Sequence, residues 1–64
     1  MHMSLRVGDQ IVVAQFVKKG IEYSGRRGMV EITQTRNRIT VLLYKTKTMP
    51  ECTIDMKQNN VRKA

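Results

Sequence analysis

Hydrophobic and polar residues alternate most clearly in the middle of the chain, on both sides of a short polar break. The two runs are Arg27–Thr35 and Arg38–Tyr44. A period of two places every second residue on the same face of a β-strand. The break, at Thr35–Asn37, contains asparagine, which adopts left-handed turn geometry at low cost. The pattern therefore predicts a β-hairpin with one apolar face, formed by Val30, Ile32, Ile39, Val41 and Leu43.

The segment before this hairpin predicts one further strand and a loop. Gly8-Asp9 is a turn signal, and the β-branched run Gln10–Val17 follows it. In that run Ile11 and Val13 share the inward parity. Lys18–Gly25 is charged, bounded by glycines and without a clear period, which indicates a long loop.

The segment after the hairpin predicts two short strands. Lys45–Pro50 is polar and ends in a proline, which cannot donate a hydrogen bond to a strand partner. Glu51–Met56 alternates again, with Cys52, Ile54 and Met56 on one face. A polar turn at Lys57–Asn60, of the 3₁₀ type at most, leads into Val61–Lys63.

These runs predict an all-β fold. Five short, mostly antiparallel strands without helical periodicity are typical of a small, partly open barrel. We expect residues 5–64 to form this single domain, and residues 1–4 to be a disordered N-terminus that is in part tag-derived. The predicted core comprises Val7, Ile11, Val13, Val30, Ile32, Ile39, Val41, Leu43, Ile54, Met56 and Val61.

Charge narrows the possible partners. Twelve Lys and Arg against five Asp and Glu give a net charge of +7 and a pI near 10.2. A domain this basic concentrates anionic partners, of which nucleic acid is the commonest, followed by acidic protein surfaces and anionic membrane. The alternative is that the charge serves solubility alone.

The single cysteine and the short apolar runs argue against several classes of protein. Cys52 is the only cysteine, so it forms no intramolecular disulfide, and with His2 alone it assembles no zinc cluster. The apolar runs are too short to span a bilayer, and no hydrophobic stretch of signal-peptide length stands at the N-terminus. We therefore expect a cytoplasmic protein that is not membrane-inserted. No activating base for Cys52 and no paired carboxylates are evident, so we expect no enzyme, no metal and no cofactor.

One glycine-containing motif carries a family resemblance. Gly8-Asp9 leads into the first strand, and the following loop ends in Gly25-Arg26-Arg27-Gly28-Met29-Val30-Glu31-Ile32. This arrangement resembles the SH3-like small barrel of the KOW type, found in the C-terminal domain of the transcription elongation factor NusG and in ribosomal proteins. The KOW pattern is Gly-x-x-Gly-x-Val-x-x-Ile, so the last apolar residue here comes one place early. The resemblance covers roughly residues 5 to 64 and implies a five-stranded SH3-like fold.

Glycines and cations at the loop-to-strand junction have separate roles. Gly28 at the entry to a strand indicates a bulge, a positive φ or close approach of another backbone. Arg26 and Arg27 either grip phosphates from the loop or form a solvated turn. Lys18 and Lys19 open the same loop, so four cations converge at one end in this prediction. Arg36 and Arg38, at the hairpin tip, form a second patch unless strand twist joins the two.

The aromatic residues leave two interpretations open. Tyr23 and Tyr44 either stack on bases, as in single-strand binders, or close one end of the core. With Phe16 they are the only aromatics, which argues against a methyl-lysine cage and against a proline-rich peptide groove.

The sequence thus predicts a binding module for RNA or DNA with little sequence readout, because phosphate contacts position a protein without reading bases. The rival hypothesis is a protein-docking accessory subunit. Small basic SH3-like barrels of this kind occur in photosynthetic electron-transfer complexes, where the basic face would receive an acidic carrier such as ferredoxin. The predicted nucleic-acid contacts are Lys18, Lys19, Tyr23, Arg26, Arg27, Arg36, Arg38 and Tyr44.

Overall fold

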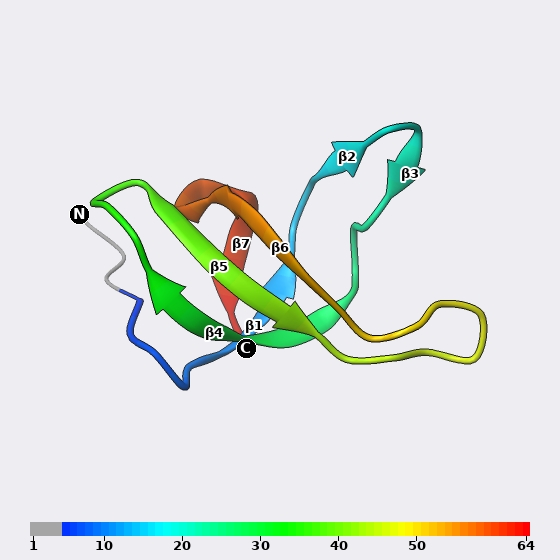
Figure 1. The fold of residues 1–64 in the computed structure, drawn as a ribbon, viewed down its shortest axis with the longest axis horizontal. Helices are drawn as coiled ribbons and strands as arrows, with labels where there is room; N and C mark the ends of the chain where they lie inside the picture. Colours follow the sequence, from blue (N-terminus) through cyan, green and yellow to red (C-terminus); the bar gives the residue numbers. More distant parts are fainter. Residues whose placement is uncertain (1–4) are drawn as a thin grey trace.

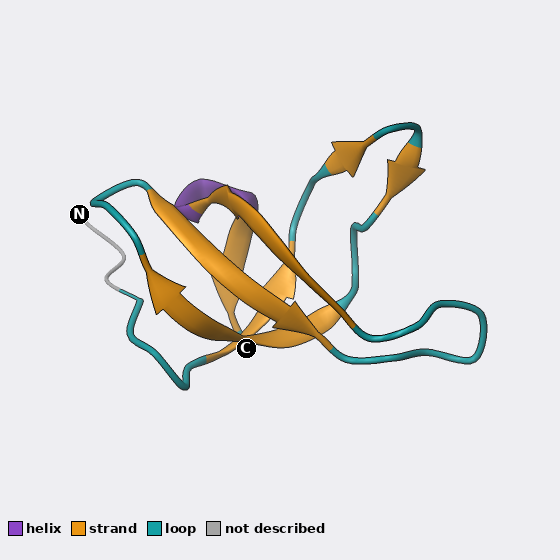
Figure 2. Cartoon of the chain, in the orientation of Figure 1, coloured by secondary structure: helices purple, strands orange, loops and turns teal. Residues whose placement is uncertain are grey.

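The computed structural model of the chain describes residues 5–64, in which antiparallel strands joined by loops are the main regular elements (Figures 1 and 2). The predicted N-terminal segment, residues 1–4, lies outside the described residues. The all-β prediction is confirmed, with seven strands instead of five. They are β1 (Gln10–Val13), β2 (Val17–Lys18), β3 (Ile21–Glu22), β4 (Arg27–Thr33), β5 (Arg38–Leu43), β6 (Cys52–Lys57) and β7 (Val61–Lys63), with a 3₁₀ turn η1 (Gln58–Asn60) before β7.

Five of the strands form one sheet in the order β6-β5-β4-β1-β7, and β2 and β3 form a separate two-stranded sheet. Four strand spacings separate the edges of a flat five-stranded sheet, about 19 Å. However, only the three residues of η1 connect the two edge strands, β6 and β7, and a 3₁₀ turn rises about 2 Å per residue. The sheet must therefore curve, as the ribbon in Figure 1 does.

The core is one cluster on the inner face of this curved sheet. Nine of the eleven predicted residues belong to it, and Leu5 and Tyr23 join them. The two exceptions, Val7 and Ile32, are 63% and 53% exposed. The core comprises Leu5, Ile11, Val13, Tyr23, Val30, Ile39, Val41, Leu43, Ile54, Met56 and Val61.

A local turn and a bulge explain the two exceptions. Val7 lies in a turn, where Asp9 N donates to Arg6 O at 3.0 Å and Arg6 N donates to the Asp9 carboxylate at 2.9 Å. In the β4–β5 ladder Val30 is opposite Val41, but Ile32 is opposite Thr40. The extra residue Glu31 is a β-bulge, which reverses the parity of the strand beyond it.

The first strand ends four residues earlier than predicted. Beyond Val13 the amide groups of Ala14 and Gln15 donate to Asn60 O, at 2.8 and 3.3 Å, so the chain leaves β1 at this point. The predicted loop Lys18–Gly25 contains strand β3 and the end of β2, because Lys19 and Gly20 both have positive φ, 52° and 79°. Two such residues form the tight hairpin turn that suits twisted strands.

Gly28 has the structural role expected of it. An ideal Cβ at this position would lie 2.1 Å from the backbone oxygen of Leu42. The backbone of β5 therefore approaches β4 too closely there for any side chain, and this close approach is the reason for glycine.

Candidate nucleic-acid interface

The surface carries a large excess of unpaired positive charge. All Lys and Arg side chains except Arg26 are exposed. Within residues 5–64 a single ion pair forms, between Lys63 Nζ and Asp9 Oδ2 at 3.7 Å. Surface cations without an ion-pair partner are free to bind an incoming anion. A candidate nucleic-acid interface is therefore a place where several of these cations lie close together.

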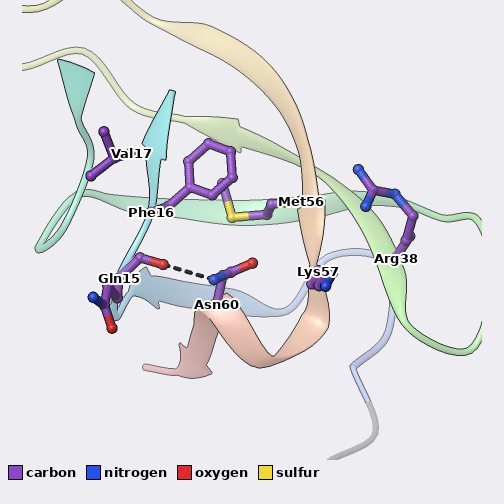
Figure 3. A pocket seen from close by; sticks show the side chains of 7 residues that line it. All are labelled: Gln15, Phe16, Val17, Arg38, Met56, Lys57 and Asn60. Carbon is purple, nitrogen blue, oxygen red and sulfur yellow. Dashed lines mark hydrogen bonds between the residues drawn. The ribbon is translucent and has the colours of Figure 1, made fainter. Parts of the chain in front are cut away.

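A groove lies between the connection from β1 to β2 and the ends of β5 and β6 (Figure 3). Its volume is about 440 Å³, within the range of small-ligand pockets. Apolar side chains and two amides form its walls, and two cations lie at its rim. The lining residues are Gln15, Phe16, Val17, Arg38, Met56, Lys57 and Asn60.

The two cations of the groove are direct cross-strand neighbours. Arg38 on β5 is paired with Lys57 on β6. Like charges at opposed positions of an antiparallel ladder repel each other. An anion bound between them would relieve this repulsion, which makes the pair a candidate phosphate contact.

Asp55 is a carboxylate whose pKa responds to a cation of each predicted patch. Its pKa lies below the ordinary carboxyl value because the Thr40 hydroxyl donates a hydrogen bond to it, at 2.7 Å, and because the Gln34 amide and the charges of Arg38 and Lys18 also favour the ionised form. Lys18 belongs to the β2–β3 hairpin and Arg38 to the β4–β5 hairpin. The field of one cation from each predicted patch thus reaches the same carboxylate, although neither cation forms an ion pair with it in the described residues.

Two further predicted cations, Lys19 and Arg36, lie within two residues of Lys18 and Arg38 in the sequence. Lys19 occupies the turn of the β2–β3 hairpin, and Arg36 lies in the loop between β4 and β5. Both side chains are exposed.

Arg27 lies elsewhere, in a row that crosses the outer face of the sheet. It is opposite Val12 on β1, and Val12 is opposite Arg62 on β7. On its other side Arg27 O accepts the amide of Tyr44 at 2.9 Å. Directly opposed residues project from the same face, so Tyr44, Arg27, Val12 and Arg62 form one continuous row, called the Tyr44 row below.

Tyr44 is held within this row. Its hydroxyl donates to Gln10 Oε1 at 3.0 Å, and 37% of the residue is exposed. Gln10 is opposite Met29 on β4, so the ring reaches across β4 to meet it. The ring is exposed next to Arg27, and base stacking by Tyr44 stays a prediction.

The expectation that Arg26 is solvated is wrong. Arg26 is only 7% exposed, and its Nη2 donates to Tyr44 O at 2.7 Å and to Pro50 O at 3.2 Å. Within the described residues its Nε and Nη1 are buried without a hydrogen-bond partner. Arg26 therefore fastens the loop between β5 and β6, and the four loop cations form no single exposed cluster.

Tyr23 closes the core, the second of its two interpretations. It is 8% exposed, and its ring lies 5.8 Å from that of Phe16 at an angle of 51°. Its amide donates to Phe16 O at 2.8 Å. This position leaves little of the ring available for a base.

Several residues of the two surfaces did not emerge from the sequence. Lys57 and Arg62 become part of the site through strand pairing, and Asn60 through its contacts with the residues that follow β1. For Arg62 alone the sequence held a signal, the alternation of the last strand: Arg62 follows the inward-facing Val61 and must therefore point outward.

Comparison of the chain with protein-family models, with curated proteins and with solved structures gives no match. In the part of the chain that the structure describes, no helix is long and apolar enough to cross a membrane. Among the same residues no three His, Cys, Asp or Glu side chains are grouped to hold a metal ion. The groove and the Tyr44 row are therefore the features of this chain that point to a function.

Proposed function

We propose that this chain is a nucleic-acid-binding module built on a small SH3-like barrel of the KOW type. The sheet order supports the fold proposal, because it sets the last strand beside the first and rolls the sheet through a 3₁₀ turn. The glycine motif also supports the fold proposal, since Gly28 lies where the backbone of β5 comes close to β4.

The observation that carries the function is the exposed and almost entirely unpaired set of cations. A polyanion that meets such a surface displaces its own condensed counterions, and their release drives binding. Contacts to phosphates supply affinity and orientation but little sequence information. The expected binding is therefore sensitive to salt and largely independent of sequence.

Two surfaces contribute in this proposal. The first comprises the groove cations with the neighbouring hairpin and loop residues: Lys18, Lys19, Arg36, Arg38 and Lys57. The second is the Tyr44 row, in which a tethered ring lies beside Arg27 at one end and Arg62 lies at the other. Aromatic rings interleaved with cations are typical of surfaces that track a single strand.

The test is a set of binding titrations at low salt with random RNA, single-stranded DNA, duplex DNA and polyglutamate. The proposal expects at least one nucleic acid to bind more tightly than millimolar and more tightly than polyglutamate. If all three nucleic acids bind more weakly than millimolar, the proposal is wrong. If polyglutamate binds as tightly as they do, the surface recognises acidic polypeptides instead.

A further inference from the structure

The groove combines an aromatic wall with a fixed framework. Phe16 packs against the core cluster that contains Met56 and Tyr23, and its ring centroid lies 5.8 Å from that of Tyr23; Figure 3 shows the Phe16 ring and Met56 on the same side of the groove. Phe16 is partly exposed and Met56 is buried. The Phe16 side chain thus packs against the core and also lines the groove.

The polar wall of the groove is held rigidly. Asn60 O accepts the amides of Ala14 and Gln15, and Asn60 Nδ2 donates to Gln15 O at 2.8 Å (Figure 3). Because Gln15 O only accepts, this bond fixes which end of the Asn60 amide is nitrogen. Within residues 5–64 no hydrogen bond engages Asn60 Oδ1, so an acceptor and the second N–H remain for a ligand.

Positive charge completes the groove at the other end. Arg38 and Lys57 line it from opposed positions of β5 and β6. A guanidinium binds phosphate oxygens in a bidentate manner. An apolar ring, an amide edge with free hydrogen-bonding groups and a cation pair line the same groove.

We infer that this groove takes one unpaired base of a single-stranded nucleic acid against Phe16, with the Asn60 amide at the base edge and the adjoining phosphate between Arg38 and Lys57. The inference rests on the proposed function and deepens it. An acidic peptide would match the cations but would leave the ring and the amide without a partner. A base inside a duplex reaches the groove only after it has been unstacked and unpaired, which is costly.

The inference therefore predicts a preference for single strands. The experiment measures the dissociation constants of a short oligothymidylate and of the same oligonucleotide annealed to its complement, at one low salt concentration. The single strand should bind about tenfold more tightly, the effect of one stacked base. Phe16→Leu should reduce this preference to about one, whereas Phe16→Tyr should retain it.

Leucine is the chosen replacement because it keeps an apolar side chain against Met56 and Tyr23. The NMR spectrum of the backbone amides and the melting temperature of each variant, compared with those of the wild type, show whether the variant is folded. A folded Phe16→Leu variant that retains the full preference overturns the inference.

A matched pair of charge variants tests the phosphate position. Arg38→Gln with Lys57→Gln removes two charges from the groove. Lys45→Gln with Lys47→Gln removes the same number from the loop at the other end of β5 and β6. The groove variant should lose at least several-fold more single-strand affinity. Equal losses overturn the assignment of phosphate to the groove.

The two proposals fail in different ways. If the wild-type chain binds neither oligonucleotide and no random RNA, the proposed function itself is wrong, whereas binding to RNA alone overturns only the groove assignment. If it binds both equally and Phe16→Leu changes nothing, the chain is a nucleic-acid binder and only the groove assignment is wrong. If polyglutamate displaces the oligothymidylate and Phe16→Leu weakens both equally, the occupant is an acidic peptide and the inference is again overturned.

Discussion

The Arg26 guanidinium donates a hydrogen bond to the backbone oxygen of Tyr44, at 2.7 Å, from a position almost fully removed from solvent. The same Nη2 reaches Pro50 O at the far end of the loop. One buried cation thus joins both ends of the segment between β5 and β6. It also fixes the backbone of Tyr44, whose hydroxyl Gln10 holds from the other side.

This arrangement predicts that Arg26 and Arg27, adjacent in sequence, differ sharply on substitution. Arg26→Ala should lower the free energy of unfolding by about 1.5–3 kcal/mol, the contribution of a hydrogen bond from a charged group. Arg27→Ala should change it by less than about 0.5 kcal/mol, because that side chain is exposed. Urea unfolding of both variants is the measurement. Equal stability of the two would contradict the assigned role of Arg26.

Gly28 predicts a second contrast. Gly28→Ala places a methyl group against the Leu42 carbonyl, and overpacking of this kind costs about 1–3 kcal/mol or more. In a domain whose core supplies about 3–5 kcal/mol, most of the stability is lost. Gly20→Ala meets no atom within 4 Å and should cost only the strain of a positive φ, about 1–2 kcal/mol. A higher melting temperature for Gly28→Ala than for Gly20→Ala would show that the backbones of β4 and β5 are not tightly packed at Gly28.

The β-bulge at Glu31 predicts a third contrast, between two apolar residues of the same hairpin. Val41→Ala should cost about 2 kcal/mol through lost transfer energy and a residual cavity, because Val41 is fully buried. Ile32→Ala should cost less than about 0.5 kcal/mol, since Ile32 is 53% exposed. Thermal unfolding of the pair measures this difference. A large loss at Ile32 would mean that the bulge does not reverse the parity of β4.

Asp55 predicts a dependence on pH. Its pKa in the folded chain is lowered from 3.8, chiefly by the Thr40 hydroxyl, so the folded state favours the ionised carboxylate. The stabilisation is fully present above about pH 3.8 and is lost as the pH falls through the lowered pKa. Asp55→Asn should therefore differ from wild type in stability above this pH and converge with it in stronger acid.

Direct titration of the Asp55 carboxyl by NMR checks the cause. Thr40→Val removes the donor and keeps the shape of the side chain, so the pKa should rise toward its ordinary value. An unchanged pKa in that variant would assign the shift to the neighbouring cations instead. Near neutral pH, Asp55→Asn should also tighten nucleic-acid binding, because it removes a negative charge that interacts electrostatically with Arg38 and Lys18.

Strand parity accounts for how much of the fold was predictable. Alternation placed Ile39, Val41 and Leu43 correctly because β5 pairs in an unbroken register with β6. It failed at Ile32, where one extra residue in β4 reverses the parity and nothing in the local pattern marks the bulge. It failed at the β2–β3 hairpin because Lys19 adopts a positive φ, which lysine rarely does.

The candidate site was less predictable than the fold because it depends on pairing between distant segments. Arg38 was identified as a cation at a hairpin tip, but its neighbour Lys57 becomes visible only when β5 and β6 are aligned. Arg26 is indistinguishable from Arg27 in sequence, and only the position of the loop ending at Pro50 determines that it is buried.

The most direct test of the proposed function is the salt dependence of binding. Affinity for a nucleic acid falls with salt at a slope of about −0.9 per neutralised phosphate on duplexes and about −0.7 on single strands. With four to six of the exposed cations engaged, the slope of log K against log salt should lie between about −3 and −5. A slope near zero, or binding no tighter than millimolar at low salt, would contradict nucleic-acid recognition by this surface.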